Sequence, residues 1–208
     1  MSTTYAYADP STTRRGRRLG PGAPVAPRRL PTVGPGGDPF GAVTVPDPHH
    51  LVHLQFRRFA GCPVCNLHLR SFARRHDEIT AAGVREVVLF HSTAEALRPF
   101  VADLPFAVVP DPGKRVYTEF GVESSVRSLL DPRGWPTILR AVAASLRGVL
   151  GRRHPVPPVR PAGGRYGLPA DVLVAPDGRV VAAHYGTRVD DHWSVDDLLA
   201  LARTAATG

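Results

Sequence analysis

The stretch FRRFAGCPVCNLHLRSF, residues 56–72, contains both cysteines of this 208-residue chain. Cys62 and Cys65 are separated by a proline and a valine, and a run of hydrophobic residues precedes them. Two thiols at this spacing can form a redox pair, supply part of a metal site or form a structural disulfide. They can also be neighbours by chance, so we use the flanking sequence to choose among these interpretations.

The flanking residues predict a strand on one side of the cysteines and a helix on the other. Residues 51–59 have the hydrophobic composition of a strand. Pro63 suits the first position of a helix, where its missing N–H needs no partner. After it, Leu69, Phe72 and Ile79 recur near the 3.6-residue helical period. The sequence therefore indicates a strand, then Cys-x-x-Cys, then a helix.

This order of elements favours thiol chemistry. The thiolate is the reactive form of cysteine, so a reactive cysteine needs a lowered pKa. Cys62 is expected at the N-cap and Cys65 in the first turn, where free amides and the helix dipole favour an anion. Arg57 and Arg58 add positive charge nearby, although strand alternation puts only one of them on either face. We interpret Cys62 and Cys65 as a catalytic redox pair, supported by Pro63 and Arg58.

Metal binding is the first alternative to a redox pair. A structural zinc site needs about four ligands, often from two such pairs, and this chain has no second pair. His68 extends the motif to CxxCxxH, and three upstream histidines keep a metal site open, although we expect His68 to be an exposed helix residue. Covalent haem attachment needs a histidine directly after the second cysteine, where Asn66 stands. We expect neither a metal nor an organic cofactor.

The rest of the chain alternates strands with helices. Such an order, with a hairpin near the end, predicts an α/β sandwich with a mixed sheet. Capping boxes are expected to begin at Ser92 and at Ser194. Further strands are predicted at 84–92 and 106–110, a hairpin at 170–186 turning at 176–178, and helices at 113–120 and 135–151. In the last of these, one predicted apolar face consists of Ile138, Val142, Leu146 and Val149.

Composition divides the chain into a tail and one domain. Residues 1–38 are rich in Pro, Gly, Ser, Thr and Arg, so we predict a disordered tail that cannot bury enough surface to offset its ordering entropy. Residues 39–208 are expected to form the domain. Within it, residues 121–165 combine a helix with a proline-rich loop, and we expect them to be an insertion over the core.

Charge and hydropathy restrict the partners and the compartment. The net charge is +8 and is almost wholly arginine, with Lys114 as the only lysine. Such a bias is a poor sign of function, so nucleic acid is not the expected partner. No apolar run reaches the ~18 residues of a membrane span, and no apolar segment of a secretory signal is visible. We expect a cytoplasmic protein, in which a cycling disulfide is more plausible than a permanent one.

Three blocks of the sequence resemble a known family. VHLQFRRFAGCPVC resembles the opening strand and active-site turn of the peroxiredoxin-like proteins of the alkyl hydroperoxide reductase/thiol-specific antioxidant (AhpC/TSA) group that carry Cys-x-x-Cys. VVLFHSTAEALRPFVADLPFAVVPDPGKRVYTEFGV and LPADVLVAPDGRVVAAHYG are similar to their later elements. The resemblance covers roughly residues 40–122 and 165–202, and it implies a thioredoxin-like three-layer α/β/α sandwich with a mixed central sheet.

Two positions depart from the ordinary peroxiredoxin pattern. Peroxiredoxins have a threonine or serine three residues before the peroxidatic cysteine, and Cys62 stands three before Cys65. They also carry an arginine just before the late strand, where this chain has Pro169. A proline there resembles the cis-proline that faces Cys-x-x-Cys in thioredoxins, so we expect a cis Leu168–Pro169 bond that supports the site.

The resemblance implies a thiol-disulfide oxidoreductase that reduces a peroxide or a protein disulfide. An external thiol, thioredoxin-like or of low molecular weight, would reset it. If the site works as in thioredoxins, Cys62 is the nucleophile, and if it works as in peroxiredoxins, the nucleophile is Cys65. We favour Cys62, because an N-cap thiol is usually the more exposed. The alternative is a non-enzymatic redox-sensing or metal-binding module on the same fold.

Overall fold

A computed structural model of the chain describes residues 17–34, 41–122, 134–151, 155–156, 158, 164 and 167–206. Its strands are β1 (Arg28–Pro31), β2 (Ala42–Val45), β3 (Leu51–Arg57), β4 (Val84–Phe90), β5 (Ala107–Pro110), β6 (Ala170–Val174) and β7 (Val180–Tyr185). Its helices are α1 (Pro63–Arg74), α2 (His76–Ala81), α3 (Ala94–Val101), α4 (Arg115–Glu119), α5 (Trp135–Leu150) and α6 (Val195–Ala206).

Five of the strands form a mixed sheet in the order β5-β4-β3-β6-β7. β3 pairs in parallel with β4, and β4 with β5, because the helical crossovers between them return the chain to the same end of the sheet. β6 lies antiparallel to both β3 and β7. The β6–β7 hairpin turns at Gly178, whose φ of +84° suits glycine. β3, the strand that leads into the cysteines, is therefore central.

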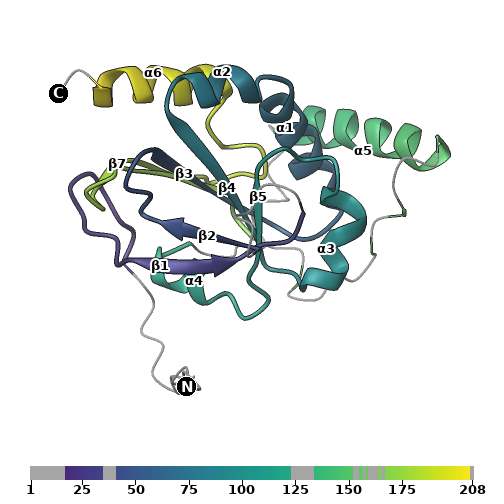
Figure 1. Ribbon diagram of the computed structural model, residues 1–208. Helices are drawn as coiled ribbons and strands as arrows, with labels where there is room; N and C mark the ends of the chain where they lie inside the picture. Colours follow the sequence, from purple (N-terminus) through teal and green to yellow (C-terminus); the bar gives the residue numbers. More distant parts are fainter. Residues whose placement is uncertain are drawn as a thin grey trace, which may run out of the picture.

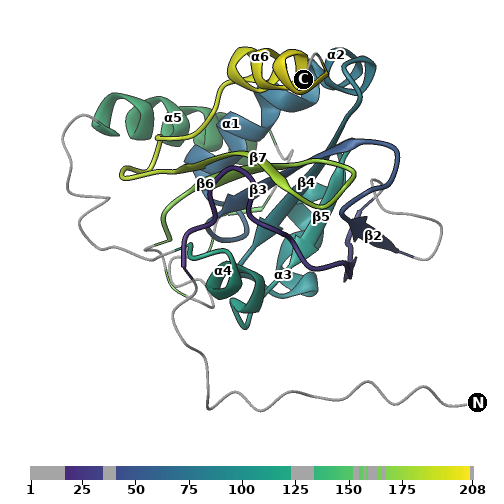
Figure 2. The same cartoon turned by 90° about the vertical axis from the view of Figure 1, so that its left-hand side faces the viewer.

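Two layers cover the sheet. Figures 1 and 2 show α1, α2 and α6 on one face, and the β1–β2 pair with α4 on the other. The first face packs a core that includes Cys62, Cys65 and Leu69, and α3 adds residues to it from the β5 edge. On the second face Phe56 of β3 packs against Phe120. The predicted α/β sandwich with a mixed sheet is confirmed, and the cysteines belong to one of its two cores.

The tail prediction is wrong for the part of it that the structure describes. β1 lies inside residues 1–38 and pairs antiparallel with β2. Val25 and Leu30 are buried in the second core. Apolar residues spaced singly among prolines and arginines are too sparse to indicate a strand, and only the pairing with β2 gives them a surface to cover. Residues 1–16 and 35–40 lie outside the described residues.

The start of α3 differs from the predicted capping box. The N-cap is Thr93, whose Oγ1 accepts a hydrogen bond from the Ala96 N–H at 3.3 Å. The Oγ of Ser92 instead accepts from the Ala60 N–H at 3.0 Å, in the turn that precedes the cysteines. The predicted cap residue therefore holds the end of β4 to that turn.

The helix predicted after the cysteines differs from the structure, whereas the predicted start of the last helix is confirmed. The single helix expected after Pro63 is divided into α1 and α2 at Arg75. The expected capping box at Ser194 is confirmed. Its Oγ accepts from the Asp197 N–H at 3.2 Å, and the Asp197 carboxylate accepts from the Ser194 N–H at 2.8 Å.

α5 forms where it is predicted, but it buries a different face. It packs against α1 through small residues, and its buried positions are Ala141, Ser145 and Gly148. Val142 and Leu146, which the apolar pattern assigns to one predicted face, are exposed. Small side chains allow the two helices to approach closely, so they make the contact in place of the larger ones.

The remainder of the predicted insertion is described at few positions. Besides α5, the structure describes only residues 121–122, 134, 151, 155–156, 158 and 164 of the range 121–165. None of the helices in the described part of the chain has the length and apolar character that a bilayer crossing requires.

The cap of α6 gives a test of the fold. We expect Ser194→Ala to lower the free energy of unfolding by about 1 kcal/mol, because the Asp197 N–H loses its acceptor. Ser194→Thr keeps a hydroxyl at the same position and should cost much less. Urea unfolding of both variants measures the difference. Equal losses would show that the hydroxyl does not cap the helix.

Candidate active site

The turn between β3 and α1 brings the two cysteines to the end of the central strand. Gly61 has a φ of +74°, and a Cβ there would lie 2.8 Å from the ring of Phe100 in α3. A glycine is needed because its backbone is left-handed and Phe100 packs closely over it. Cys62 follows as the N-cap of α1, and Pro63 occupies the first helical turn. The predicted strand–Cys-x-x-Cys–helix order is confirmed.

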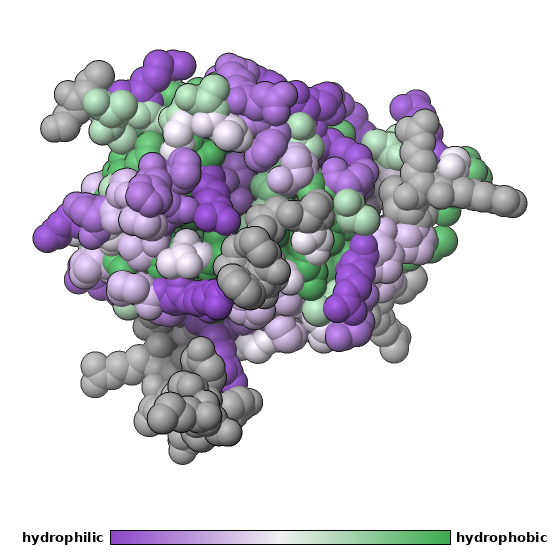
Figure 3. All heavy atoms as spheres, viewed as in Figure 1, coloured by the Kyte–Doolittle hydropathy of each residue, from purple (hydrophilic) through white to green (hydrophobic). Residues whose placement is uncertain are grey.

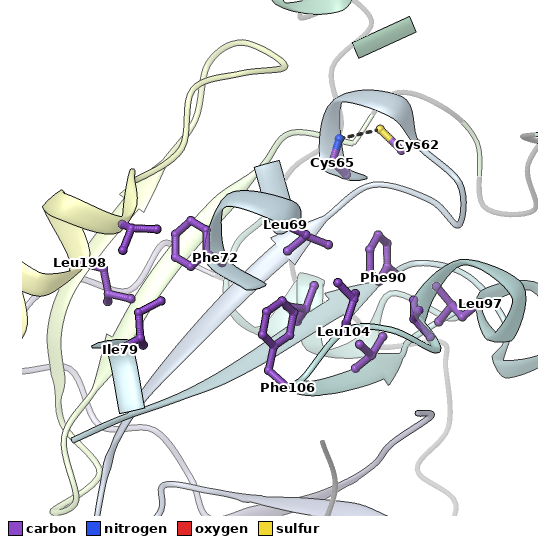
Figure 4. Close-up of a cluster of buried hydrophobic side chains, with 14 of the residues drawn as sticks. Cys62, Cys65, Leu69, Phe72, Ile79, Phe90, Leu97, Leu104, Phe106 and Leu198 are labelled. Atoms are coloured by element: carbon purple, nitrogen blue, oxygen red, sulfur yellow. Dashed lines mark hydrogen bonds between the residues drawn. The ribbon is translucent and has the colours of Figure 1, made fainter. Parts of the chain in front are cut away.

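Both cysteines are free, and they lie in the same turn at the start of α1 (Figure 4). The Cys62 Sγ accepts from the Cys65 N–H at 3.4 Å, as an N-cap side chain does. Both residues are buried, with exposed fractions of 2% for Cys62 and 6% for Cys65. The expectation that the N-cap thiol is the more exposed of the two is therefore wrong.

The surroundings push the pKa values of the two thiols in opposite directions. Burial raises the pKa of Cys62 well above its usual value, and the neighbouring Cys65 raises it further. Burial also works against the thiolate of Cys65. There, however, the hydrogen bond from the Cys62 thiol, the charge of Arg58 and a hydrogen bond from the Arg58 backbone bring the pKa down to about 5. These opposite shifts favour the thiolate at Cys65 over that at Cys62.

Arg58 is the group that distinguishes this pair from two buried thiols in an apolar core. The residue is only 5% exposed, and its positive charge acts on both cysteines. Arginine stays protonated at any ordinary pH, so its buried charge favours an anion beside it. The sequence prediction that Arg58 lies near the cysteines is consistent with these contacts.

The prediction for Pro169 does not hold. The Leu168–Pro169 bond is trans, and the cis bond of the described residues is Val45–Pro46. Pro169 begins the approach to β6, where its carbonyl accepts from the Gly186 N–H at 2.9 Å. The position just before the late strand resembles that of the thioredoxin proline, but sequence position alone does not determine the isomer.

Gly167 rather than Pro169 lies over the arginine of the site. A Cβ at Gly167 would approach the Arg58 Cγ to 3.2 Å and the His91 Nε2 to 3.0 Å. His91 is buried at the end of β4, and neither of its ring nitrogens has a hydrogen-bond partner among the described residues. Burial, together with the charge of Lys114, lowers the pKa of His91 to about 4. The imidazole is therefore neutral, and it adds no competing charge next to Arg58.

A row of polar residues on β3 lies beneath α1. His53, Gln55 and Arg57 alternate with apolar residues, so all three side chains point to the α1 face of the sheet. The Arg57 Nη2 donates to the Asp171 Oδ1 at 2.7 Å, and the two His53 ring nitrogens lie 2.8 Å from Glu86 and 3.1 Å from Asp171. All these side chains are buried, and the charged ones neutralise one another.

This network extends from the thiols to a hollow on the surface. Arg57 is among the charges that lower the pKa of Cys65. The Arg57 Nη2 also lies 2.9 Å from the His68 Nε2, and the centroids of the His68 and His192 rings are 3.6 Å apart. His68 and His192 line a hollow of about 340 Å³ between α1 and the start of α6. The expectation that His68 is exposed is wrong.

Sequence reasoning therefore missed part of the surroundings of the thiols. The signal was present in LVHLQFR, where three polar residues alternate within an otherwise apolar central strand. Such a pattern in a buried strand indicates paired polar groups. Asp171, which completes the pairing, lies more than a hundred residues later and gives no comparable signal.

One hollow adjoins Cys62, and a second lies beside the start of α1 and is lined by neither cysteine. The first, small and apolar with about 10 Å³, lies between α1 and α3, and its lining includes Cys62, Asn66 and Phe100. The second, a larger groove of about 600 Å³, runs between α1 and α5, with Pro63 and Asn66 at one side and Arg147 at the other. No cluster of three or more metal-ligating side chains occurs among the described residues, so the metal alternative gains no support.

Comparison with known proteins identifies the family. Residues 71–188 match the family model described as AhpC/TSA antioxidant enzyme, which is more than half of the chain. The chain belongs to the AhpC/TSA family. Membership supports a thiol-based redox function of the oxidoreductase kind, with a peroxide or a thiol reductant as the general partner. The matched residues begin inside α1, after both cysteines of this AhpC/TSA protein, so the roles of Cys62 and Cys65 rest on the geometry above.

Solved structures show the same fold. AhpC of Mycobacterium tuberculosis has a TM-score of 0.62 at 14% identity, with 92% of this chain and 95% of that one covered. The peroxidoxin BcpB of the same organism gives 0.61 at 14%, covering 90% and 98%. A protein described as the thiol:disulfide interchange protein DsbE of Chlorobium tepidum gives 0.52 at 20%, covering 91% and 99%. These likenesses confirm the thioredoxin-like fold. No curated protein matches the sequence of this AhpC/TSA chain.

The charge of Arg58 can be tested through the pKa of Cys65. Because Arg58→Gln removes the nearest positive charge from the thiolate, we expect the pH profile of alkylation at Cys65 to move upward by about 1–3 pH units. Mass spectrometry across a range of pH follows that rate. Arg70→Gln removes an exposed arginine of α1 that pairs with Asp103, and it should leave the profile unchanged. An unshifted profile in Arg58→Gln would contradict the assignment.

The buried network gives a separate prediction about stability. We expect Asp171→Asn to lower the free energy of unfolding by about 3–5 kcal/mol, because it leaves the buried charge of Arg57 without its carboxylate and His53 with only that of Glu86. Asp103→Asn, which breaks an exposed ion pair, should cost less than about 1 kcal/mol. Guanidinium unfolding of both variants measures the contrast, and similar losses would count against the network.

Proposed function

We propose that this chain is a peroxide-reducing thiol oxidoreductase in which Cys65 attacks the peroxide and Cys62 resolves the product. The observation that carries the proposal is the buried positive charge of Arg58, which acts on both cysteines of the turn between β3 and α1. It favours a thiolate at Cys65, while Cys62 keeps its proton and donates a hydrogen bond to that thiolate. This reverses the preference for Cys62 that helix position alone suggests.

The reaction is a two-electron transfer in three steps. The Cys65 thiolate attacks one oxygen of a peroxide ROOH, the O–O bond breaks, and the leaving RO⁻ takes up a proton. Cys65 becomes a sulfenic acid. The sulfur of Cys62 then attacks the Cys65 sulfur, water leaves, and a disulfide forms. An external thiol reductant supplies two electrons and two protons and restores both thiols.

Burial favours a peroxide over a protein disulfide as the substrate. With 2% and 6% of the two cysteines exposed, a disulfide on a folded partner cannot bring its sulfur against either thiol without a rearrangement. A peroxide presents two oxygens at its reactive end.

The supporting residues have separate roles in the proposal. Arg58 stabilises the thiolate and can hydrogen-bond the peroxide oxygens as negative charge develops on the leaving one. Pro63 starts α1 directly after Cys62 without presenting an N–H that needs a partner. Pro169 keeps a packing role against Gly186 and has no part in the chemistry. Because the cycle ends with a free dithiol, it requires a reducing compartment, for which we propose the cytoplasm.

Single cysteine variants test the assignment of the two sulfurs. After hydrogen peroxide treatment, Cys65→Ser should show no fast oxidation of Cys62, because the remaining thiol has a raised pKa. Cys62→Ser should still react at Cys65 and accumulate its sulfenic acid, which a dimedone adduct detects by mass spectrometry. Wild type should lose both thiols together as one disulfide.

A reductant-coupled peroxide assay then separates an enzyme from a sensor. Wild type should turn over with dithiothreitol as the reductant, and Cys65→Ser should lose the cycling rate because it lacks the attacking thiolate. Cys62→Ser should keep part of that rate, because dithiothreitol can reduce the Cys65 sulfenic acid directly. Sulfenic acid on Cys62 in the Cys65→Ser variant would reverse the assignment. A disulfide that forms in wild type but does not turn over with reductant would instead favour a redox-sensing module.

A further inference from the structure

The exposed face of α5 is the most apolar surface among the described residues. Five of its large apolar side chains are between 42% and 83% exposed, and Val156 is the remaining large exposed one in the described part of the chain. We call these five residues the α5 stripe: Trp135, Leu139, Val142, Leu146 and Leu150. In Figure 3 hydrophobic residues reach the surface at the right-hand side, where Figure 1 places α5.

The stripe is one continuous face of the helix. Its members follow one another at intervals of four, three, four and four residues, and residues three or four apart are neighbours on a helix surface. At 3.6 residues per turn, the stripe and the small residues that pack on α1 lie about 130° apart around the axis of α5. The packing that holds α5 to the domain therefore leaves the stripe uncovered.

Four of the five stripe residues form pairs when the helix is laid against its own reverse, and Val142 falls within one residue of the axis. If two copies of α5 lie antiparallel about an axis between residues 142 and 143, Trp135 of each lies opposite Leu150 of the other. Leu139 likewise lies opposite Leu146, and the two Val142 side chains meet near the axis. A two-fold interface requires this kind of self-complementary surface. Every large residue of the stripe then has an apolar partner.

Charge and area are compatible with a second copy. α5 has no acidic residue, and its two arginines, Arg140 and Arg147, lie about 110° around the helix from the stripe, outside the contact. Burying five large apolar side chains from each copy removes about 1,000 Å² of surface, which is the lower limit for a specific interface. The groove between α1 and α5 stays open, because Arg147 and Ala144 line it from another side of the helix.

We infer that the α5 stripe is the contact of a symmetric dimer of this chain, formed by antiparallel packing of α5 against its copy. The inference goes beyond the proposed chemistry and does not depend on it. A contact at this lower limit of size is expected to be a reversible dimer rather than a permanent one. The dimer would place a copy of the Cys62–Cys65 site on each side of the paired helices.

Sedimentation velocity of the full chain over a range of concentrations tests the inference. Wild type should show a reversible monomer–dimer equilibrium. Leu139→Glu and Leu146→Glu each place a charge on the stripe and should weaken dimerisation by at least about tenfold. Both sites are exposed, so circular dichroism should show an intact fold. Arg140→Glu, on the same helix but off the stripe, is the matched control and should dimerise as wild type does.

Cross-linking tests the orientation. In a Cys62→Ser, Cys65→Ser background, Val142→Cys should form a disulfide with its own copy, because residue 142 lies next to the two-fold axis. Leu150→Cys should not link to itself, but should link to Trp135→Cys when the two variants are mixed. A wild type that stays monomeric at all concentrations would overturn the inference. So would a dimer that Leu139→Glu and Leu146→Glu leave unchanged, because it would use another surface.

Discussion

The charge of Arg58 is the constraint around which the site is organised. A guanidinium cannot release its proton at ordinary pH, so burying it demands an anion or a set of acceptors nearby. Here the groups within its reach are two thiols, of which one can become that anion. The buried charge of Arg58 lowers the pKa of Cys65 and so favours its thiolate. Stability and reactivity at this site depend on one interaction.

The charge of the second buried arginine, Arg57, is neutralised by a carboxylate. Arg57 is neutralised by Asp171, and the carboxylates of Asp171 and Glu86 also hold His53. Because this arginine already has a carboxylate, its charge acts on Cys65 only at longer range. The two adjacent arginines therefore have different roles. Arg57 belongs to the polar row beneath α1, whereas the charge of Arg58 acts mainly on the two cysteines.

The sequence predicted most of the strands and helices, and the reasons are local. Capping at Ser194, the turn at Gly178 and the proline at the start of α1 are each determined by neighbours in the chain. Predictions that depended on distant partners were less successful. β1 exists because β2 pairs with it, and the apolar pattern of α5 does not reveal that small residues such as Ala141 make the contact with α1.

The sequence by itself determined that two thiols lie at the start of a helix after a buried strand, with arginines beside them. It could do so because that arrangement is continuous in the chain. Only the tertiary structure distinguishes the surroundings of the two thiols, because the burial of Cys62, the placement of Arg58 and the pairing of Arg57 with Asp171 depend on residues brought together by the sheet. The trans bond before Pro169 was decided there too, since the isomer depends on packing around the proline and not on its position in the sequence.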